Sequence, residues 1–174
     1  TIRPPMIGWS PLVPRSRVIA GSEIAAGPAA NLQDDLGAVR WITAWGVVTA
    51  AAGAYVDLDY GTSHSPTAFG AFATNLTATA SHRITWGSSP GAADLWDSGT
   101  VAAQVQPGYG RTILIPPAPI PHRYCRWAFD DPDNPDRCLM IGHLAVCACW
   151  QPNQYLTTDS SYGPRALSQS QIVT

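Results

Sequence analysis

The chain has 174 residues, which is enough to bury a hydrophobic core within one domain. Hydrophobic residues make up 45% of it and charged residues only 13%, and the formal net charge is −2. This charge excludes the basic surface that is typical of nucleic-acid-binding proteins. No apolar run reaches the roughly 20 residues that a membrane-spanning helix needs. We therefore expect neither nucleic acid nor membrane among the partners.

Residues 1–30 are rich in proline, glycine and alanine and show no hydrophobic period. The prolines exclude a long helix, and the segment lacks the continuous apolar core of a signal peptide. We expect an extended N-terminal arm here, ordered by contacts with neighbouring subunits. Its apolar anchors would be Ile2, Met6, Ile7, Trp9 and Leu12.

Short alternating segments separated by turn residues follow the arm. They predict strands over residues 39–48, 55–60, 67–74, 79–86, 95–98, 111–115, 123–130 and 138–150. About eight short strands at this spacing indicate an all-β sandwich or barrel. We assign the sandwich to residues 31–150 and a polar C-terminal tail to residues 151–174.

Alternation also divides each strand into a core face and an outer face. In 55–60, Tyr55, Asp57 and Asp59 lie opposite the apolar set, and in 79–86 the outer set contains Arg83 and Thr85. The expected core side chains are Val56, Leu58, Ile84, Trp86, Ile113, Ile115, Trp127, Phe129 and Ile141, and also Trp41 and Trp45.

The sequence contains no nucleophile elbow, zinc-protease helix or phosphate loop. We therefore expect no catalytic residues, no cofactor and no enzyme activity. The loop with Asp130, Asp131, Asp133 and Asp136 has carboxylates that suit calcium, but its prolines and its missing glycine favour a polar turn.

The cysteine spacing matches no common zinc motif. Cys147 and Cys149 are two residues apart and would share one face of a strand. We expect Cys125, Cys138, Cys147 and Cys149 to be reduced and mostly buried, in preference to a disulfide or a metal site.

Six segments occur in an order that resembles the discoidin-like, galactose-binding-like proteins of bacteriophage particles. They are AAGPAANLQDD (25–35), AYVDLDYG (54–61), ATNLTATASHRITWGSS (73–89), LWDSGTV (95–101), HRYCRWAFDDPDNPDRCLMIGHLAVC (122–147) and WQPNQYLTTDSSYG (150–163). The resemblance covers about residues 20–165 and implies a discoidin-type jelly-roll β-sandwich with irregular arms. In such sandwiches Asn75 of the NLTA motif would make a structural corner.

The resemblance implies a non-enzymatic virion structural protein in the tail tip or baseplate of a tailed phage or phage-like particle, which assembles through its sandwich and terminal arms. Its partners would be other virion proteins in a symmetric assembly of many copies, put together in the bacterial cytoplasm. A carbohydrate-binding adhesin module that contacts the host surface is one alternative, and a head decoration or neck protein is another. Contacts with protein or sugar would come from the exposed aromatic candidates Trp96, Tyr109 and Tyr162.

Overall fold

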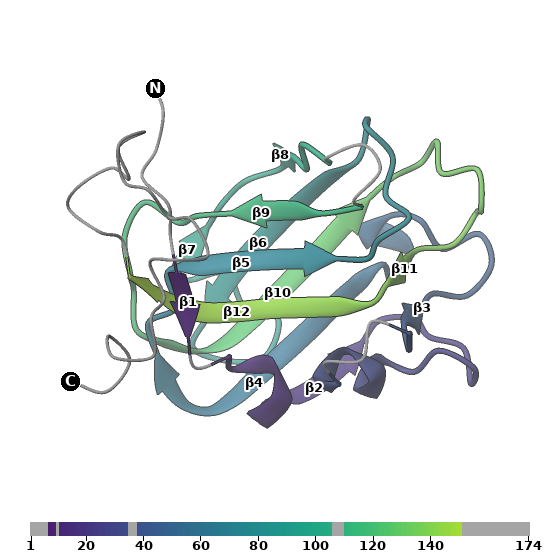
Figure 1. The fold of residues 1–174 in the computed structure, drawn as a ribbon. Coiled ribbons are helices and arrows are strands. Elements are labelled where there is room, and N and C mark those ends of the chain that lie inside the picture. The colour runs from purple at the N-terminus through teal and green to yellow at the C-terminus, as the bar shows by residue number, and fades with distance from the viewer. Residues whose placement is uncertain (1–6, 10, 35–37, 106–109, 151–174) are drawn as a thin grey trace, which may run out of the picture.

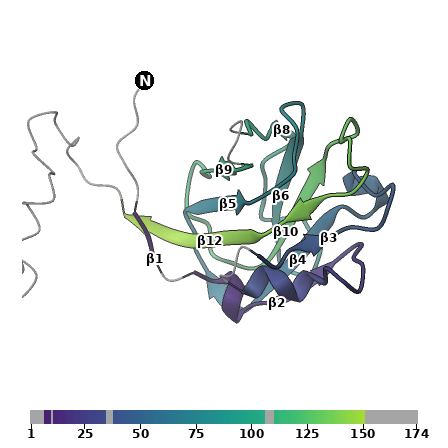
Figure 2. The same ribbon diagram turned by 45° about the vertical axis from the view of Figure 1, so that its right-hand side comes forward.

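Two antiparallel β-sheets pack face to face, as Figures 1 and 2 show. The computed structural model describes residues 7–9, 11–34, 38–105 and 110–150, with the backbone alone for residues 7–9 and 150. Apart from short 3-10 turns at Val13–Arg15, Ala29–Gln33 and Ala50–Ala52, the regular structure in these ranges is strand. The predicted all-β sandwich is confirmed. No helix in this part of the chain is long and apolar enough to cross a membrane.

The strands form two layers and a small ribbon. The four-stranded sheet has the order β1 (Ile7–Trp9), β12 (His143–Trp150), β5 (Ala68–Phe72), β9 (Thr112–Leu114). The six-stranded sheet has the order β2 (Arg17–Ala20), β4 (Tyr55–His64), β10 (His122–Asp130), β6 (Ser81–Gly87), and β6 also pairs with β7 (Trp96–Asp97) and β8 (Val101–Ala102). The ribbon pairs β3 (Trp41–Ile42) with β11 (Met140–Ile141).

Aromatic side chains fill the space between the two sheets. Phe69 of β5 meets Trp86 and Trp127 of the opposite sheet at centroid distances of 5.9 and 6.0 Å. Trp127 also stacks on Phe129 at 5.3 Å. All four rings are fully buried, so they supply much of the apolar area that holds the sheets together. The expected core positions that are buried are Trp41, Val56, Leu58, Ile84, Trp86, Trp127, Phe129 and Ile141.

Three expected core residues lie on the surface instead. Ile113 and Ile115 are 54% and 37% exposed, because β9 turns Thr112 inward and Ile113 outward. Residues 111–115 contain too short an apolar run to set the phase of the alternation. Trp45 is 74% exposed, because β3 ends at Ile42 and the chain turns at Gly46 with φ of +83°.

Two segments of the predicted N-terminal arm pair with strands of the sandwich. Residues 7–9 form β1, which pairs with β12, and residues 17–20 form β2, which pairs with β4. Backbone hydrogen bonds to β12 and β4 hold these two segments in the sheets. An edge strand can pair in this way without a hydrophobic period in its sequence. The C-terminal tail predicted over residues 151–174 lies outside the described residues.

All four cysteines are free thiols, as expected. Cys125 is buried in the core as expected, but the expected burial is wrong for Cys138, Cys147 and Cys149, which are only half-buried. Burial raises the pKa of the Cys125 thiol to about 12. This thiol is therefore protonated at neutral pH and acts as a small core side chain.

Replacing the central core ring should destabilise the sandwich severely. Trp127→Ala removes a fully buried indole and leaves His82 Nδ1 without its donor, Trp127 Nε1, at 3.3 Å. We expect a loss of about 3–5 kcal/mol in the free energy of unfolding, measured by urea denaturation. Trp45→Ala is the matched control, because this indole is exposed, and it should change stability by about 0.5 kcal/mol or less. Equal losses in the two variants would contradict the assigned core.

Acid should destabilise the fold through His82. Burial lowers the pKa of His82 from 6.5 to about 4 in the folded chain. Between these values the unfolded chain binds a proton that the folded chain does not, so protonation favours unfolding. The contribution of His82 to the free energy of unfolding is fully present above pH 6.5. It falls as the pH falls toward 4, by up to about 1.4 kcal/mol per pH unit. Urea midpoints across this range should fall less steeply for His82→Gln; an unchanged pH dependence would rule out this contribution.

Candidate functional site

A polar cleft of about 280 Å³ lies on the outer face of the six-stranded sheet. Its floor comes from three neighbouring strands in fixed register. Ala128 of β10 is opposite Tyr55 of β4 on one side and Arg83 of β6 on the other, and Arg126 is opposite Thr85. Alternation places these residues on the face opposite Trp127, so the cleft rests directly on the aromatic core.

Arg126 is held rigidly at the centre of this face. Its Nε and Nη2 atoms donate hydrogen bonds to the two carboxylate oxygens of Asp57, each at 2.7 Å. The guanidinium also lies over the ring of Tyr55, 4.0 Å from the centroid. The hydrogen bonds with Asp57 raise the pKa of Arg126. A bidentate pair and a ring contact together fix the orientation of the group before any ligand arrives.

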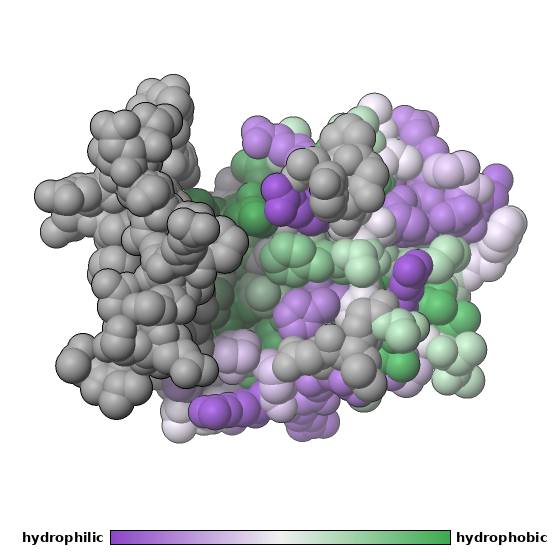
Figure 3. All heavy atoms as spheres, viewed as in Figure 1, coloured by the Kyte–Doolittle hydropathy of each residue, from purple (hydrophilic) through white to green (hydrophobic). Residues whose placement is uncertain are grey.

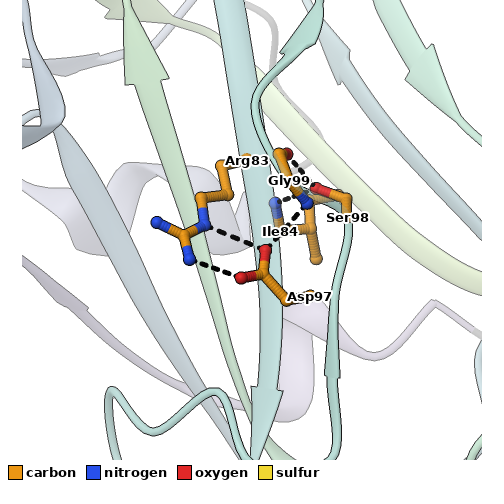
Figure 4. A network of polar contacts seen from close by, with 5 residues as sticks. All are labelled: Arg83, Ile84, Asp97, Ser98 and Gly99. Carbon is orange, nitrogen blue, oxygen red and sulfur yellow. Dashed lines mark hydrogen bonds and ion pairs between the residues drawn. The ribbon is translucent and has the colours of Figure 1, made fainter.

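Arg83 is held in the same way on the next strand, as Figure 4 shows. Its Nε donates to Asp97 Oδ1 at 2.9 Å, and its Nη2 contacts Asp97 Oδ2. The Gly99 N–H donates to Asp97 Oδ1 at 2.8 Å, while the Ser98 hydroxyl accepts a hydrogen bond from the Ile84 N–H. The hydrogen bond from Arg83 holds the pKa of Asp97 below its usual range.

A loop and a carboxylate complete the rim. Gly91 approaches Arg126 so closely that a Cβ would lie 2.8 Å from Nη2, and its φ of +75° also favours glycine. At the other end, Asp130 Oδ1 accepts a hydrogen bond from the Ala50 N–H at 2.9 Å. This bond orients the carboxylate of Asp130, which also lines the cleft.

The arrangement suits a ligand with many hydroxyl groups. Each arginine uses Nε and Nη2 on its aspartate, so Nη1 can donate to a ligand in the cleft. The Asp130 carboxylate and the Thr85 hydroxyl line the same space. Donors and acceptors are therefore close together on a rigid sheet, and Tyr55 adds an apolar ring. The described residues contain no group of three or more side chains that could hold a metal ion.

Of the aromatic candidates, Trp96 is the one that the structure describes. It lies opposite Trp86 in the β6–β7 pair, on the core side of the sheet edge, and its ring centroid is 4.3 Å from that of Trp86. Trp96 is half-buried and packs against the core, whereas its neighbour Asp97 accepts a hydrogen bond from Arg83, which lines the cleft. Tyr109 and Tyr162 lie outside the described residues.

The structure describes only some of the expected assembly anchors. Ile2 and Met6 lie outside the described residues, and Ile7 and Trp9 are described by their β1 backbone alone. Leu12 is half-buried against the core of its own chain, and its N–H donates to Val146 O at 2.9 Å. Leu12 therefore has partners within its own sandwich.

The aspartate-rich turn is occupied by its own hydrogen bonds. Asp131 is fully buried and accepts hydrogen bonds from the Thr77 N–H, the Thr77 hydroxyl and Asn134 Nδ2 at 2.5–2.9 Å. Asn75 donates to Cys138 O at 2.9 Å and accepts from the Met140 N–H at 2.8 Å. The NLTA segment is thus the structural corner that the resemblance implied.

The alternation in the sequence places the main cleft residues on the outer faces of their strands, but it does not show that these strands are neighbours in one sheet. The alternation had set Tyr55 and Asp57 opposite one core strand, and Arg83 and Thr85 opposite another. What it lacked was strand order, because β10 enters between β4 and β6 from far along the chain. Arg126 in the alternating run 123–130 was the available signal for a central charged position.

No protein-family model and no curated protein sequence matches this chain. Solved structures match its fold. A family 32 carbohydrate-binding module of NanJ from C. perfringens, in complex with galactose, has a TM-score of 0.57 and 14% identity over 78% of this chain and 95% of that one.

Two further solved structures have a similar fold. A chitosan-binding module of a Paenibacillus chitosanase/glucanase has a TM-score of 0.58 and 15% identity over 79% of this chain and 98% of that one. The lectin domain of lectinolysin, complexed with Lewis B antigen, has a TM-score of 0.56 and 12% identity over 79% and 96% of the two chains. Because the identities are only 12–15%, these comparisons show the fold alone, which is a galactose-binding-like, discoidin-type β-sandwich.

Proposed function

We propose that this chain is a carbohydrate-binding domain that holds a saccharide in the cleft on the outer face of its six-stranded sheet. The observation that carries the proposal is the pair of arginines, Arg83 and Arg126, each fixed by an aspartate and each lining the same polar space. Sugar hydroxyls both donate and accept, so they match neighbouring guanidinium and carboxylate groups. The role is binding alone, without catalysis.

The solved structures of the same fold support this proposal. One of those proteins is in complex with galactose, one is a chitosan-binding module, and one is complexed with Lewis B antigen. The pre-ordered charges of the cleft add physical support, because donors that are already fixed lose little conformational entropy when a ligand arrives. A saccharide on a host or neighbouring cell surface is the corresponding partner.

The test is saccharide binding by the purified chain and by matched arginine variants. A glycan array followed by calorimetry should identify a ligand. Arg83→Met should then weaken binding about tenfold or more, because a charge-assisted hydrogen bond to the sugar is lost. Arg123→Met is the control, since Arg123 forms the same kind of pair with Asp59, at 2.6 Å, but does not line the cleft.

The control should bind the saccharide with nearly the affinity of the unchanged chain. Equal losses in the two variants would place the sugar elsewhere on the sandwich, and an array without any bound saccharide would refute the function itself. Near-ultraviolet circular dichroism of each variant checks that the tryptophan core is intact.

A second candidate function is the structural role in a phage particle that the sequence resemblance implies. The observation in its favour is the outer face of the four-stranded sheet, where Ile113 and Ile115 are exposed beside an apolar groove. An exposed apolar face of this kind suits contact with other subunits of an assembly. Many copies in a symmetric virion, assembled in the host cytoplasm, belong to this second proposal.

The second proposal is tested by fractionating virus particles from the cells that make this protein. A virion component should sediment with the particles at a constant ratio to the major particle protein after high-salt washing. A chain that stays with the soluble or cell-surface fraction is not a structural component.

A further inference from the structure

An apolar groove of about 520 Å³ runs along β5 on the outer face of the four-stranded sheet. Small residues of β5, Ala68 and Gly70, form its floor. Ile113 and Ile115 stand on one side, because Ile113 lies opposite Gly70 in the β5–β9 pair. Figure 3 shows hydrophobic residues gathered on this face, which is the one turned toward the viewer in Figure 1.

Two thiols form part of the opposite wall. Cys147 and Cys149 both point outward from β12, and their sulfur atoms are 3.8 Å apart. The backbone that carries them is fixed, because the Cys149 N–H donates to Thr67 Oγ1 at 2.7 Å and the Thr67 N–H donates to Cys147 O at 3.0 Å. At this separation a single atom that forms bonds of about 2.3 Å to sulfur can bridge both thiols, because two such bonds span up to about 4.6 Å.

The described surroundings of the two thiols do not offer the further ligands that a structural zinc site needs. Burial, and then the contact with Cys149, raises the pKa of Cys147 to about 11, so this thiol is protonated at neutral pH. Structural zinc needs deprotonated sulfur and usually four protein ligands. Among the described residues no cluster of three or more metal-ligating side chains exists. A ligand that takes two neutral thiols and brings its own third substituent fits this wall better.

We propose that Cys147 and Cys149 form a dithiol site for trivalent organoarsenicals, R–As=O, with the organic group R in the apolar groove. The two S–H bonds and the As–O bonds break, two As–S bonds form, and the oxygen leaves with both protons as water. Arsenic stays trivalent, so no oxidant or reductant is needed. Reactants and products are uncharged, so no charge has to be buried in the groove. The site is independent of saccharide binding.

The probe is phenylarsine oxide, added to the full chain in a phosphine reductant. Intact-protein mass spectrometry should show one phenylarsenic group per chain, with one water lost. Closing a ring with the second sulfur should strengthen binding roughly 100-fold over a single thiol. Cys147→Ser and Cys149→Ser should each lose that factor, measured by competition with a small dithiol. Cys138→Ser, which removes another half-buried thiol, is the control and should bind as the unchanged chain does.

The role of the groove is tested separately with Ile115→Asp, which places a carboxylate in the apolar wall while keeping both sulfurs. It should weaken the phenyl compound more than its methyl analogue. Unchanged affinity in both serine variants, or a loss of affinity in the Cys138 control, would overturn the dithiol site. Equal weakening of the phenyl and methyl compounds would overturn the placement of the organic group.

Discussion

The pairing of β10 with β4 along one edge and β6 along the other is the constraint on which the rest of the structure depends. Alternate residues of β10 serve opposite purposes. Cys125, Trp127 and Phe129 enter the core, while Arg126 stands on the outer face. A slip of one residue would exchange the two sets. The register that packs the core therefore also brings Arg126 beside Asp57 and Thr85, so that folding and cleft assembly are one event.

The two outer faces of the sandwich differ in chemistry. The six-stranded sheet presents three arginine–aspartate pairs, Arg83–Asp97, Arg126–Asp57 and Arg123–Asp59. Pairing neutralises their charge but keeps their hydrogen-bonding directions, which is useful for an uncharged polar ligand. The four-stranded sheet presents an apolar groove with two sulfurs at its wall. One small domain thus offers two separate surfaces, and a ligand on one is screened from the other by the tryptophan core.

The alternation in the sequence predicted the architecture because β4, β6 and β10 are long enough to show a period of two. Val56, Leu58 and Ile84 were assigned to the core on that basis and are buried. The shorter strands contain too few residues for the alternation to show which side chains face the core. β9 has three residues and β3 has two, so Ile113 and Trp45 were given the wrong face. Likewise, β1 and β2 are recognisable only from their partners, because their order comes from backbone hydrogen bonds.

The candidate site was predictable only in pieces. Its residues come from strands far apart in sequence, and strand order in a sandwich depends on long-range packing that local pattern does not encode. The sequence predicts Trp96 as an exposed aromatic contact residue. In the structure its ring packs beside Trp86 at the edge of the core. The charged residues opposite the core strands were the better guide, since a charge held in place on a sheet face needs a partner on the adjacent strand.

The most direct test of the account is nuclear magnetic resonance of the arginine Nε–H groups during titration with a saccharide that the chain binds. Arg83, Arg123 and Arg126 each donate Nε–H to an aspartate, which slows exchange with water and makes these signals observable. The account predicts that the Arg83 and Arg126 signals shift together with saturation while the Arg123 signal stays in place. A saturating saccharide that leaves both cleft signals unchanged would contradict it.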